Sequence, residues 1–343
     1  MSLRMDPAER VRLGRTRLSV TRLGLGTAPL GGLFHAVAKA EARATVEGAY
    51  AAGLRLFDTA PLYGYGLAER RLGRVLRAKP RPDFVLATKV GRLLRAGAAP
   101  DPTQSHQGEP FYKGTPPLTP VFDFSYDGVM RSVAESLERL GLDTIDILHI
   151  HDPDAHFDEA LRGAYRALDR LRGEGTIAAV GVGMNQPGML VRFAREADVD
   201  CFLLAGRYTL LDQTALAELL PTCVERSIPV ISGGVYNSGI LADPRPGATF
   251  DYIPAPPDLV ARARRLEAVC VRHGVPLPAA AIQFPLGHPA VAAVVVGCRS
   301  PAEVEENVRL FRHEVPAALW EDLRRERLIR EGVPAPEPEG RRA

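Results

Sequence analysis

The chain is poor in cysteine, has almost no net charge and lacks any long apolar run. Its 343 residues carry 43 Lys and Arg against 41 Asp and Glu, a formal net charge of +2. This balance argues against binding to nucleic acid or to an anionic membrane, because both attract a basic surplus or stripe. A membrane-spanning helix needs about 18 consecutive apolar residues, and the sequence contains no such run. Residues 1–20 are charged throughout, so we expect no signal peptide.

The cysteines are too dispersed to form a metal site. They are Cys201, Cys223, Cys270 and Cys298. No CxxC pair and no Cys/His spacing typical of zinc occurs, and we predict no metal. Most of these cysteines stand in apolar segments, where a buried free thiol is the usual state. A reduced, cytoplasmic protein is therefore expected, and the sequence does not indicate its oligomeric state.

Short apolar runs alternate with amphipathic stretches along most of the chain. The runs have the length expected of strands that are buried on both faces of a parallel sheet. They are residues 22–26, 54–58, 84–90, 145–150, 177–182, 201–205, 229–232 and 292–296. Helical patterns occur at residues 41–53, 68–77, 127–140, 158–173, 187–196, 212–227, 257–274 and 301–312. Strands that are each followed by a helix predict an α/β protein with a single (β/α)8 TIM barrel.

The alternative is an open doubly wound sheet. Such a sheet binds dinucleotides through a GxGxxG turn between its first strand and first helix, with an acidic residue further along. Neither feature is placed in this way here. The barrel is therefore the favoured architecture.

Several segments interrupt the alternation of strands and helices. Residues 91–124 contain six prolines and no periodicity, which predicts a long loop after the third strand, at the face of a barrel that carries active sites. Residues 233–256 have the same placement after the seventh strand. We expect a C-terminal helix around residues 316–329 and a disordered tail at residues 332–343, which leaves residues 1–331 as one domain.

Four residues with useful chemistry stand at or near the ends of three consecutive predicted strands. Asp58 closes the second strand and Tyr63 follows it in a glycine-rich turn, while Lys89 and His151 end the third and fourth strands. A tyrosine beside a lysine can act as a general acid toward a carbonyl oxygen, and we expect the ammonium to lower the pKa of the phenol. Asp58 would orient the lysine and His151 would polarise the substrate. His149 lies one layer deeper and is expected to be an ordinary core histidine.

The motifs around these residues resemble those of the aldo-keto reductase superfamily. The matching segments are GLGTAPLGG (24–32), FDTAPLYGYGLAE (57–69), ATKV (87–90), DILHIHDP (146–153), AAVGVGMNQ (178–186) and VVVGCRSPAEVEENV (294–308). They follow the order of the family. The segments HIHDPD, GVGMNQ and GGVYNSGIL further resemble the branch of D-threo-aldose (L-fucose) 1-dehydrogenases and pyridoxal 4-dehydrogenases.

The resemblance implies a catalytic tetrad and a nicotinamide dinucleotide extended across the barrel mouth. The tetrad falls on Asp58, Tyr63, Lys89 and His151. The segment 233–241 would wrap the pyrophosphate with backbone N–H groups, and the start of the last barrel helix would hold the adenosine end. The implied cofactor contacts are Gly26, Thr27, Asn185, Asn237, Ser238, Gly239, Leu241, Gly297, Arg299, Glu303, Glu306 and Asn307.

The sequence departs from the family pattern around the nicotinamide. The Ser-Asn pair common on the fifth strand reads Gly183-Met184, so Asn185 is expected to take that role from one position later. The usual glutamine of the sixth strand aligns with Ala205. The aromatic residue of the seventh strand aligns near Gly233, so either Tyr236 or another residue compensates or the nicotinamide ring is held less tightly.

Residues near the adenosine end favour NAD over NADP. Members that prefer the phosphorylated cofactor often have basic residues where this chain has Gly297 and Glu303. A carboxylate near the ribose repels a 2′-phosphate and accepts a hydrogen bond from a free 2′-hydroxyl. Arg299 argues the other way, since it can pair with a phosphate.

The leading hypothesis is a dehydrogenase that moves a hydride between NAD(P) and the anomeric carbon of an aldose such as L-fucose or D-arabinose, or of a related hemiacetal such as that of pyridoxal. Asp152 and Asp154 could hydrogen-bond sugar hydroxyls, but a capping turn around Pro153 is the favoured explanation for them. A general NADPH-dependent aldehyde or ketone reductase is an alternative. Two further alternatives are a lyase that forms a Schiff base on Lys89 and a non-catalytic cofactor-binding subunit.

Overall fold

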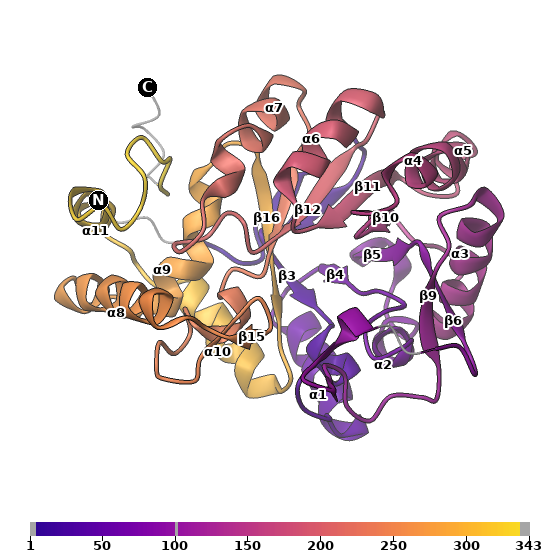
Figure 1. Ribbon diagram of the computed structural model, residues 1–343, viewed down its shortest axis with the longest axis horizontal. Coiled ribbons are helices and arrows are strands. Elements are labelled where there is room, and N and C mark those ends of the chain that lie inside the picture. The colour runs from indigo at the N-terminus through magenta and orange to yellow at the C-terminus, as the bar shows by residue number, and fades with distance from the viewer. Residues whose placement is uncertain (1–4, 100–101, 337–343) are drawn as a thin grey trace.

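The apolar runs become the strands of a closed barrel in the computed structural model, which describes residues 5–99 and 102–336 (Figure 1). The strands are β3 (Leu23–Gly26), β4 (Leu56–Asp58), β5 (Val85–Val90), β10 (Ile147–His151), β11 (Ala179–Met184), β12 (Cys201–Ala205), β13 (Val230–Gly233) and β16 (Val291–Gly297). All neighbours are parallel, and β16 pairs with β3 to close the ring. The predicted TIM barrel is confirmed.

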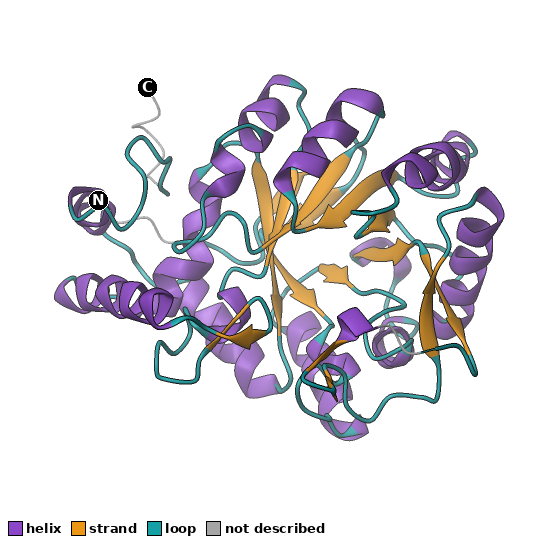
Figure 2. Cartoon of the chain, in the orientation of Figure 1, coloured by secondary structure: helices purple, strands orange, loops and turns teal. Residues whose placement is uncertain are grey.

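Helices surround this barrel (Figure 2). They are α1 (Lys39–Ala51), α2 (Leu67–Leu76), α3 (Tyr126–Leu140), α4 (Phe157–Glu159), α5 (Arg166–Gly173), α6 (Pro187–Glu196), α7 (Leu219–Glu225), α8 (Pro257–Arg272), α9 (Leu277–Gln283), α10 (Pro301–Phe311) and α11 (Ala317–Arg325). A π-helical turn, Ala160–Tyr165, joins α4 to α5, where the sequence predicts one continuous helix. Among the described residues, no helix has the length and apolar character needed to cross a membrane.

The helix between the last two barrel strands differs from the prediction. We expect residues 257–274 to fill this place, but they form α8, which contacts α9 and α11 (Figure 1). The short helix α9 packs against α10 instead. Six of the seven residues of α9 are buried and its sequence is apolar on nearly all sides, so it carries no amphipathic period by which to recognise it.

An N-terminal hairpin covers the end of the barrel opposite the predicted site. Strands β1 (Arg10–Arg12) and β2 (Ser19–Thr21) pair in antiparallel fashion. The side chains of Leu13, Leu18 and Val20 form one buried cluster with barrel residues such as Leu56 and Ile147, which are the first residues of β4 and β10. The hairpin therefore closes the barrel floor and leaves the opposite mouth open.

The two long loops contain strands that the sequence does not reveal. In residues 91–124, β6 (Arg92–Arg95) pairs with β9 (Thr119–Phe122), and β7 (Ser105–His106) pairs with β8 (Glu109–Pro110). After β13, strands β14 (Thr249–Phe250) and β15 (Ile253–Pro254) form a small hairpin. Both loops rise at the barrel mouth, as predicted.

The start of the predicted tail packs on the barrel. Val333 and Ala335 are buried, and the hydroxyl of Tyr208 donates to the carbonyl oxygen of Pro334 at 3.4 Å. The expectation of disorder is therefore wrong for residues 332–336, and residues 337–343 lie outside the described part of the chain. All four cysteines are buried free thiols, in agreement with their apolar surroundings.

Candidate active site

A buried ion pair joins the ends of β4 and β5. Lys89 Nζ lies 2.7 Å from both carboxylate oxygens of Asp58 and donates a third hydrogen bond to the carbonyl oxygen of Thr59 at 2.9 Å. Only 1% of Lys89 and 4% of Asp58 is exposed. Burial raises the pKa of Asp58, and the ammonium of Lys89 opposes this effect. All three N–H donors of the lysine are used, so the ammonium is fixed in position.

Tyr63 lies over this ion pair. Lys89 Nζ is 4.7 Å from the centroid of the Tyr63 ring, and the ring of His151 meets the Tyr63 ring edge to face at a centroid distance of 5.9 Å. The glycine-rich turn holds the tyrosine here through a close backbone contact. A Cβ on Gly64, whose φ is +60°, would lie 2.1 Å from the carbonyl oxygen of Gly31, so no larger residue fits.

The electrostatics of the tyrosine contradict the sequence-based expectation. Burial, with a further contribution from the carboxylate of Asp58, raises the pKa of Tyr63 well above its ordinary value of 10. The ammonium of Lys89 does not reverse the shift because Asp58 neutralises it at 2.7 Å. The prediction of a lowered phenol pKa is therefore wrong for the protein alone, in which Tyr63 is a protonated donor.

The two histidines of β10 are both neutral. Burial lowers the pKa of His151 well below 6.5, and the positive charges of Arg92 and Lys89 add to the effect. His149 lies deeper, and burial lowers its pKa to about 3. Neither ring nitrogen of His149 has a hydrogen-bond partner among the described residues, so it is not the satisfied core residue that its position predicts.

Two cavities meet at Tyr63. The larger cavity, of about 740 Å³, extends from Asp58 and Tyr63 past the segment 233–239 to the start of α10 at Glu303. The smaller cavity, of about 460 Å³, lies on the side of Lys89 and His151 under the 91–124 loop. Tyr63 and Asn185 line both of them. Ligands bound in the two cavities would therefore both contact Tyr63.

Most of the predicted cofactor residues line the larger cavity. They are Gly26, Asn185, Asn237, Ser238, Gly239, Gly297, Arg299, Glu303, Glu306 and Asn307. Thr27 and Leu241 do not line it, and both are fully buried. Thr27 Oγ1 donates to the carbonyl oxygen of Asp58 at 3.0 Å and so ties β3 to β4. The structure thus corrects the expectation of cofactor contact for these two residues.

Backbone N–H groups in the turn after β13 donate to carbonyl oxygens of the same turn. The N–H of Asn237 donates to Gly234, and the N–H groups of Gly239 and Leu241 both donate to Tyr236. These groups are therefore already paired, contrary to the expectation that they face a pyrophosphate. Ser238 stands apart with a φ of +60°, and its hydroxyl oxygen accepts a hydrogen bond from the N–H of Tyr252 at 3.1 Å.

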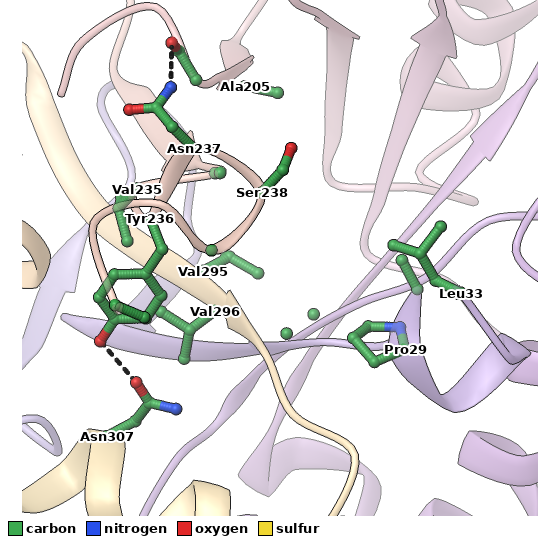
Figure 3. Close-up of a pocket in the computed structure, with 18 of the residues that line it drawn as sticks. Pro29, Leu33, Ala205, Val235, Tyr236, Asn237, Ser238, Val295, Val296 and Asn307 are labelled. Atoms are coloured by element: carbon green, nitrogen blue, oxygen red, sulfur yellow. Dashed lines mark hydrogen bonds between the residues drawn. The ribbon is translucent and has the colours of Figure 1, made fainter. Parts of the chain in front are cut away.

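Side-chain amides hold the walls of the larger cavity (Figure 3). Asn237 donates to the carbonyl oxygen of Gly206 at 3.0 Å and accepts from the hydroxyl of Thr209 at 2.6 Å. The hydroxyl of Tyr236 donates to Asn307 Oδ1 at 2.6 Å and thereby connects the β13 turn to α10. Asn237 and Asn307 are thus occupied with protein partners and shape the cavity.

The far end of the larger cavity carries an ion pair. Arg299 Nε and Nη2 lie 3.0 and 2.8 Å from one carboxylate oxygen of Glu303, whose other oxygen accepts from the Arg299 N–H at 2.7 Å. Glu306 is paired with Arg309, whose Nε and Nη2 lie 2.8 and 2.6 Å from its two carboxylate oxygens. From the sequence, Glu303 favours NAD and Arg299 favours NADP. Because the two side chains form one ion pair, their effects on cofactor preference are coupled.

Other residues at the mouth were missed in the sequence because they lie in the irregular loops. Arg92 and Tyr112 line the smaller cavity and Tyr252 lines both. Tyr252 stands in a hairpin turn with a φ of +69°, and Asp251 beside it is held by the guanidinium of Arg207 at 2.7 and 3.0 Å. Their positions depend on pairing between distant segments, so no local pattern identifies them. The predicted substrate residues Asp152 and Asp154 do line the smaller cavity.

A parallel barrel with this ion pair, tyrosine and histidine at its mouth is the architecture of a barrel oxidoreductase. The model of the Aldo/keto reductase family matches residues 22–325, and the chain belongs to this family. It is therefore an oxidoreductase that uses a nicotinamide cofactor.

Relatives of known activity are similar over nearly the whole chain. A pyridoxal 4-dehydrogenase from Microbacterium luteolum is 45% identical, over 95% of this chain and 100% of the relative. A D-threo-aldose 1-dehydrogenase from a Pseudomonas species is also 45% identical, over 91% of this chain and 95% of the relative. The solved structure of an aldo-keto reductase from Bacillus halodurans in its holo form has a TM-score of 0.71 and 25% identity, covering 95% of this chain and 97% of that one.

Proposed function

We propose that this protein is an NAD-preferring dehydrogenase that oxidises the anomeric carbon of a cyclic aldose to a lactone. The observation that carries the proposal is the position of Tyr63, which stands at the junction of the two cavities above the Lys89–Asp58 pair. The cofactor fills the larger cavity and the substrate fills the smaller one. The relatives named for D-threo-aldose and for pyridoxal support this choice, since both compounds present a hydroxyl on a ring carbon as cyclic hemiacetals.

The larger cavity suits an extended dinucleotide. Its volume of about 740 Å³ lies within the usual range for cofactor sites, and part of its wall is glycine backbone, at Gly26, Gly233, Gly234 and Gly297. A Cβ at Gly239 would meet no atom within 4 Å, so the wall there faces open space. Asn185 would contact the nicotinamide end, the hydroxyl of Ser238 the pyrophosphate, and the Arg299–Glu303 pair the adenosine end.

The tetrad then provides the proton chemistry. In the oxidative direction, Tyr63 takes the proton of the anomeric hydroxyl, while neutral His151 hydrogen-bonds the same oxygen. Lys89, fixed by Asp58, lies 4.7 Å from the centroid of the Tyr63 ring and orients it, while the phenolate that this step requires forms against the raised pKa of the buried phenol. The bound nicotinamide supplies the acceptor for the hydride that leaves the anomeric carbon. In the reductive direction Tyr63 returns its proton to the carbonyl oxygen.

A substrate panel tests the proposed function. L-fucose, D-arabinose, other aldoses, pyridoxal and simple alcohols are each supplied with NAD or NADP, simple aldehydes are supplied with NADH or NADPH, and the change in nicotinamide absorbance is followed. We expect at least one aldose to be oxidised with a higher kcat/KM than any simple alcohol. Oxidation of pyridoxal alone would assign the hemiacetal of that aldehyde instead, and NADPH-dependent reduction of aldehydes without aldose oxidation would favour the general reductase.

The Arg299–Glu303 pair leads to a prediction on cofactor preference. Glu303→Arg removes the carboxylate that occupies Arg299 and places a second cation beside the ribose. One charge-assisted hydrogen bond changes affinity on the order of tenfold, so the ratio of kcat/KM with NADP to that with NAD should rise by at least this factor. The control, Glu303→Gln, frees Arg299 without adding charge and should give a smaller rise. An unchanged ratio in both variants would refute the role of Glu303.

The geometry of Lys89 disfavours the lyase alternative. A Schiff base requires a neutral amine with a free lone pair, whereas all three N–H groups of Lys89 donate to Asp58 and Thr59. Borohydride added with substrate should therefore leave no adduct on Lys89. The non-catalytic alternative is disfavoured by the assembly of the complete tetrad around one junction.

A further inference from the structure

Arg92 enters the smaller cavity from the first position of β6. The chain turns sharply out of β5 at Gly91, which has a φ of +103°, and a Cβ there would lie 2.1 Å from the ring of Phe124. Only glycine permits this turn. The turn, fixed by the β6–β9 pairing, directs Arg92 over the end of β10.

The guanidinium of Arg92 is held on three sides. Nη1 donates to the carbonyl oxygen of His151 at 3.2 Å, and Nη2 donates to Asp152 Oδ2 at 3.2 Å. Its central carbon lies 4.5 Å from the centroid of the Phe122 ring. Only 5% of the residue is exposed, so this cation belongs to the cavity wall and not to the protein surface.

Asp152 receives this support in a strained backbone conformation. Its φ is +43°, which is uncommon for a residue other than glycine. The N–H of Asp152 donates to the carbonyl oxygen of Gly183 at 3.0 Å, which anchors the turn to β11. Oδ2 faces Arg92 and lies 3.4 Å from His151 Nε2, whereas Oδ1 makes no hydrogen bond among the described residues. The carboxylate is therefore held in place beside the tetrad with one oxygen unused.

Part of the lining of the smaller cavity is an apolar cluster. It is formed by Leu33, Leu62, Phe111 and Tyr112. A ligand that fits this lining has hydroxyl groups on one edge and hydrocarbon on the other, as a pyranose ring does. A short aliphatic aldehyde offers nothing to the carboxylate.

Within the proposed function, we propose that Asp152 is the specificity-determining residue and that Arg92 is its positioning residue. Asp152 accepts hydrogen bonds from ring hydroxyls next to the anomeric carbon, and Arg92 holds the carboxylate in the orientation this requires. A site built to bind a hydroxyl discriminates strongly against substrates that lack it. The pair therefore selects polyhydroxylated cyclic substrates over simple aldehydes.

The test compares two substrates in each variant. The readout is the kcat/KM for oxidation of the best aldose divided by the kcat/KM for reduction of butanal. Asp152→Asn should lower this ratio about 100-fold and Arg92→Met about tenfold, the range expected for hydrogen bonds to a charged group, with the loss mainly in a raised KM for the aldose. Arg92→Lys should recover part of the ratio and replaces Arg92→Met if that variant does not fold.

A matched control comes from the same strand. Arg95 pairs with Glu135 at 3.0 Å and does not line the cavity, so Arg95→Met should leave the ratio unchanged. Equal losses for aldose and butanal in the Asp152 and Arg92 variants would show that the pair only supports His151 and would overturn the inference. An unchanged ratio in an enzyme that oxidises aldoses would also overturn it. Absence of any aldose oxidation by the wild type would instead refute the proposed function, and the inference with it.

Discussion

Tyr63→Phe is expected to lower kcat for aldose oxidation by about 10²–10⁴-fold, the usual contribution of a general acid–base group. The substitution removes only the phenolic oxygen, so the ring contacts with Lys89 and His151 remain. Cofactor affinity, measured by titration of nicotinamide fluorescence, should change little because the rest of the larger cavity is untouched. A variant that retains most of its activity would show that the proton is transferred elsewhere.

The pH dependence provides a second readout of the same residue. Oxidation needs the phenolate, and burial raises the pKa of Tyr63 well above 10 in the protein alone. The phenolate fraction therefore increases with pH, and kcat/KM for oxidation should rise from about pH 7 to about pH 10. Reduction needs the protonated phenol and should not share this rise. In Tyr63→Phe, the residual oxidation rate should lose its dependence on pH.

Lys89→Met should both inactivate and destabilise the protein. The variant leaves the carboxylate of Asp58 buried without a counter-charge, a change that typically costs about 3–5 kcal/mol in the free energy of unfolding. Urea unfolding at about pH 8 measures this loss. Without Lys89 the pKa of Asp58 rises further, so the folded state favours protonated Asp58 and the deficit should shrink as the pH falls toward about 5.

The double variant separates the two effects. Asp58→Asn combined with Lys89→Met removes both charges, and replacing a buried ion pair in this way is often close to neutral for stability. We expect its unfolding free energy to return to within about 1 kcal/mol of the wild type, while activity stays low. A single Lys89→Met variant as stable as the wild type at about pH 8 would contradict the buried ion pair.

The barrel was predictable because its signal is local. Strands buried on both faces require continuous apolar residues, and each run, from residues 22–26 to residues 292–296, matches a strand of the structure to within a few positions. The tetrad residues were found for a related reason, since three of them stand at strand ends. Helix α9 was missed because burial on nearly all sides removes the amphipathic pattern.

The cavity walls could not be predicted in the same way. Arg92 points inward only because β6 pairs with β9 across the intervening loop, and a pairing over that distance leaves no periodic trace. Thr27 was misassigned because its hydroxyl bonds to Asp58 of the neighbouring strand. The predicted direction of the Tyr63 pKa shift was wrong. Burial of the phenol outweighs the effect of a lysine that Asp58 neutralises, and this burial is not visible in a sequence motif.

The two cavities share lining residues, among them Tyr63, Asn185 and Tyr252, but most of their other lining residues come from different turns of the barrel. The larger one is lined mainly by the turns after β3, β13 and β16, and the smaller one by the turns after β5 and β10. Mutations in residues 91–124 or 152–156 can therefore alter which molecule is oxidised without disturbing the cofactor. These two segments are therefore the ones to replace when a different substrate range is wanted, because most of the lining of the larger cavity then stays unchanged.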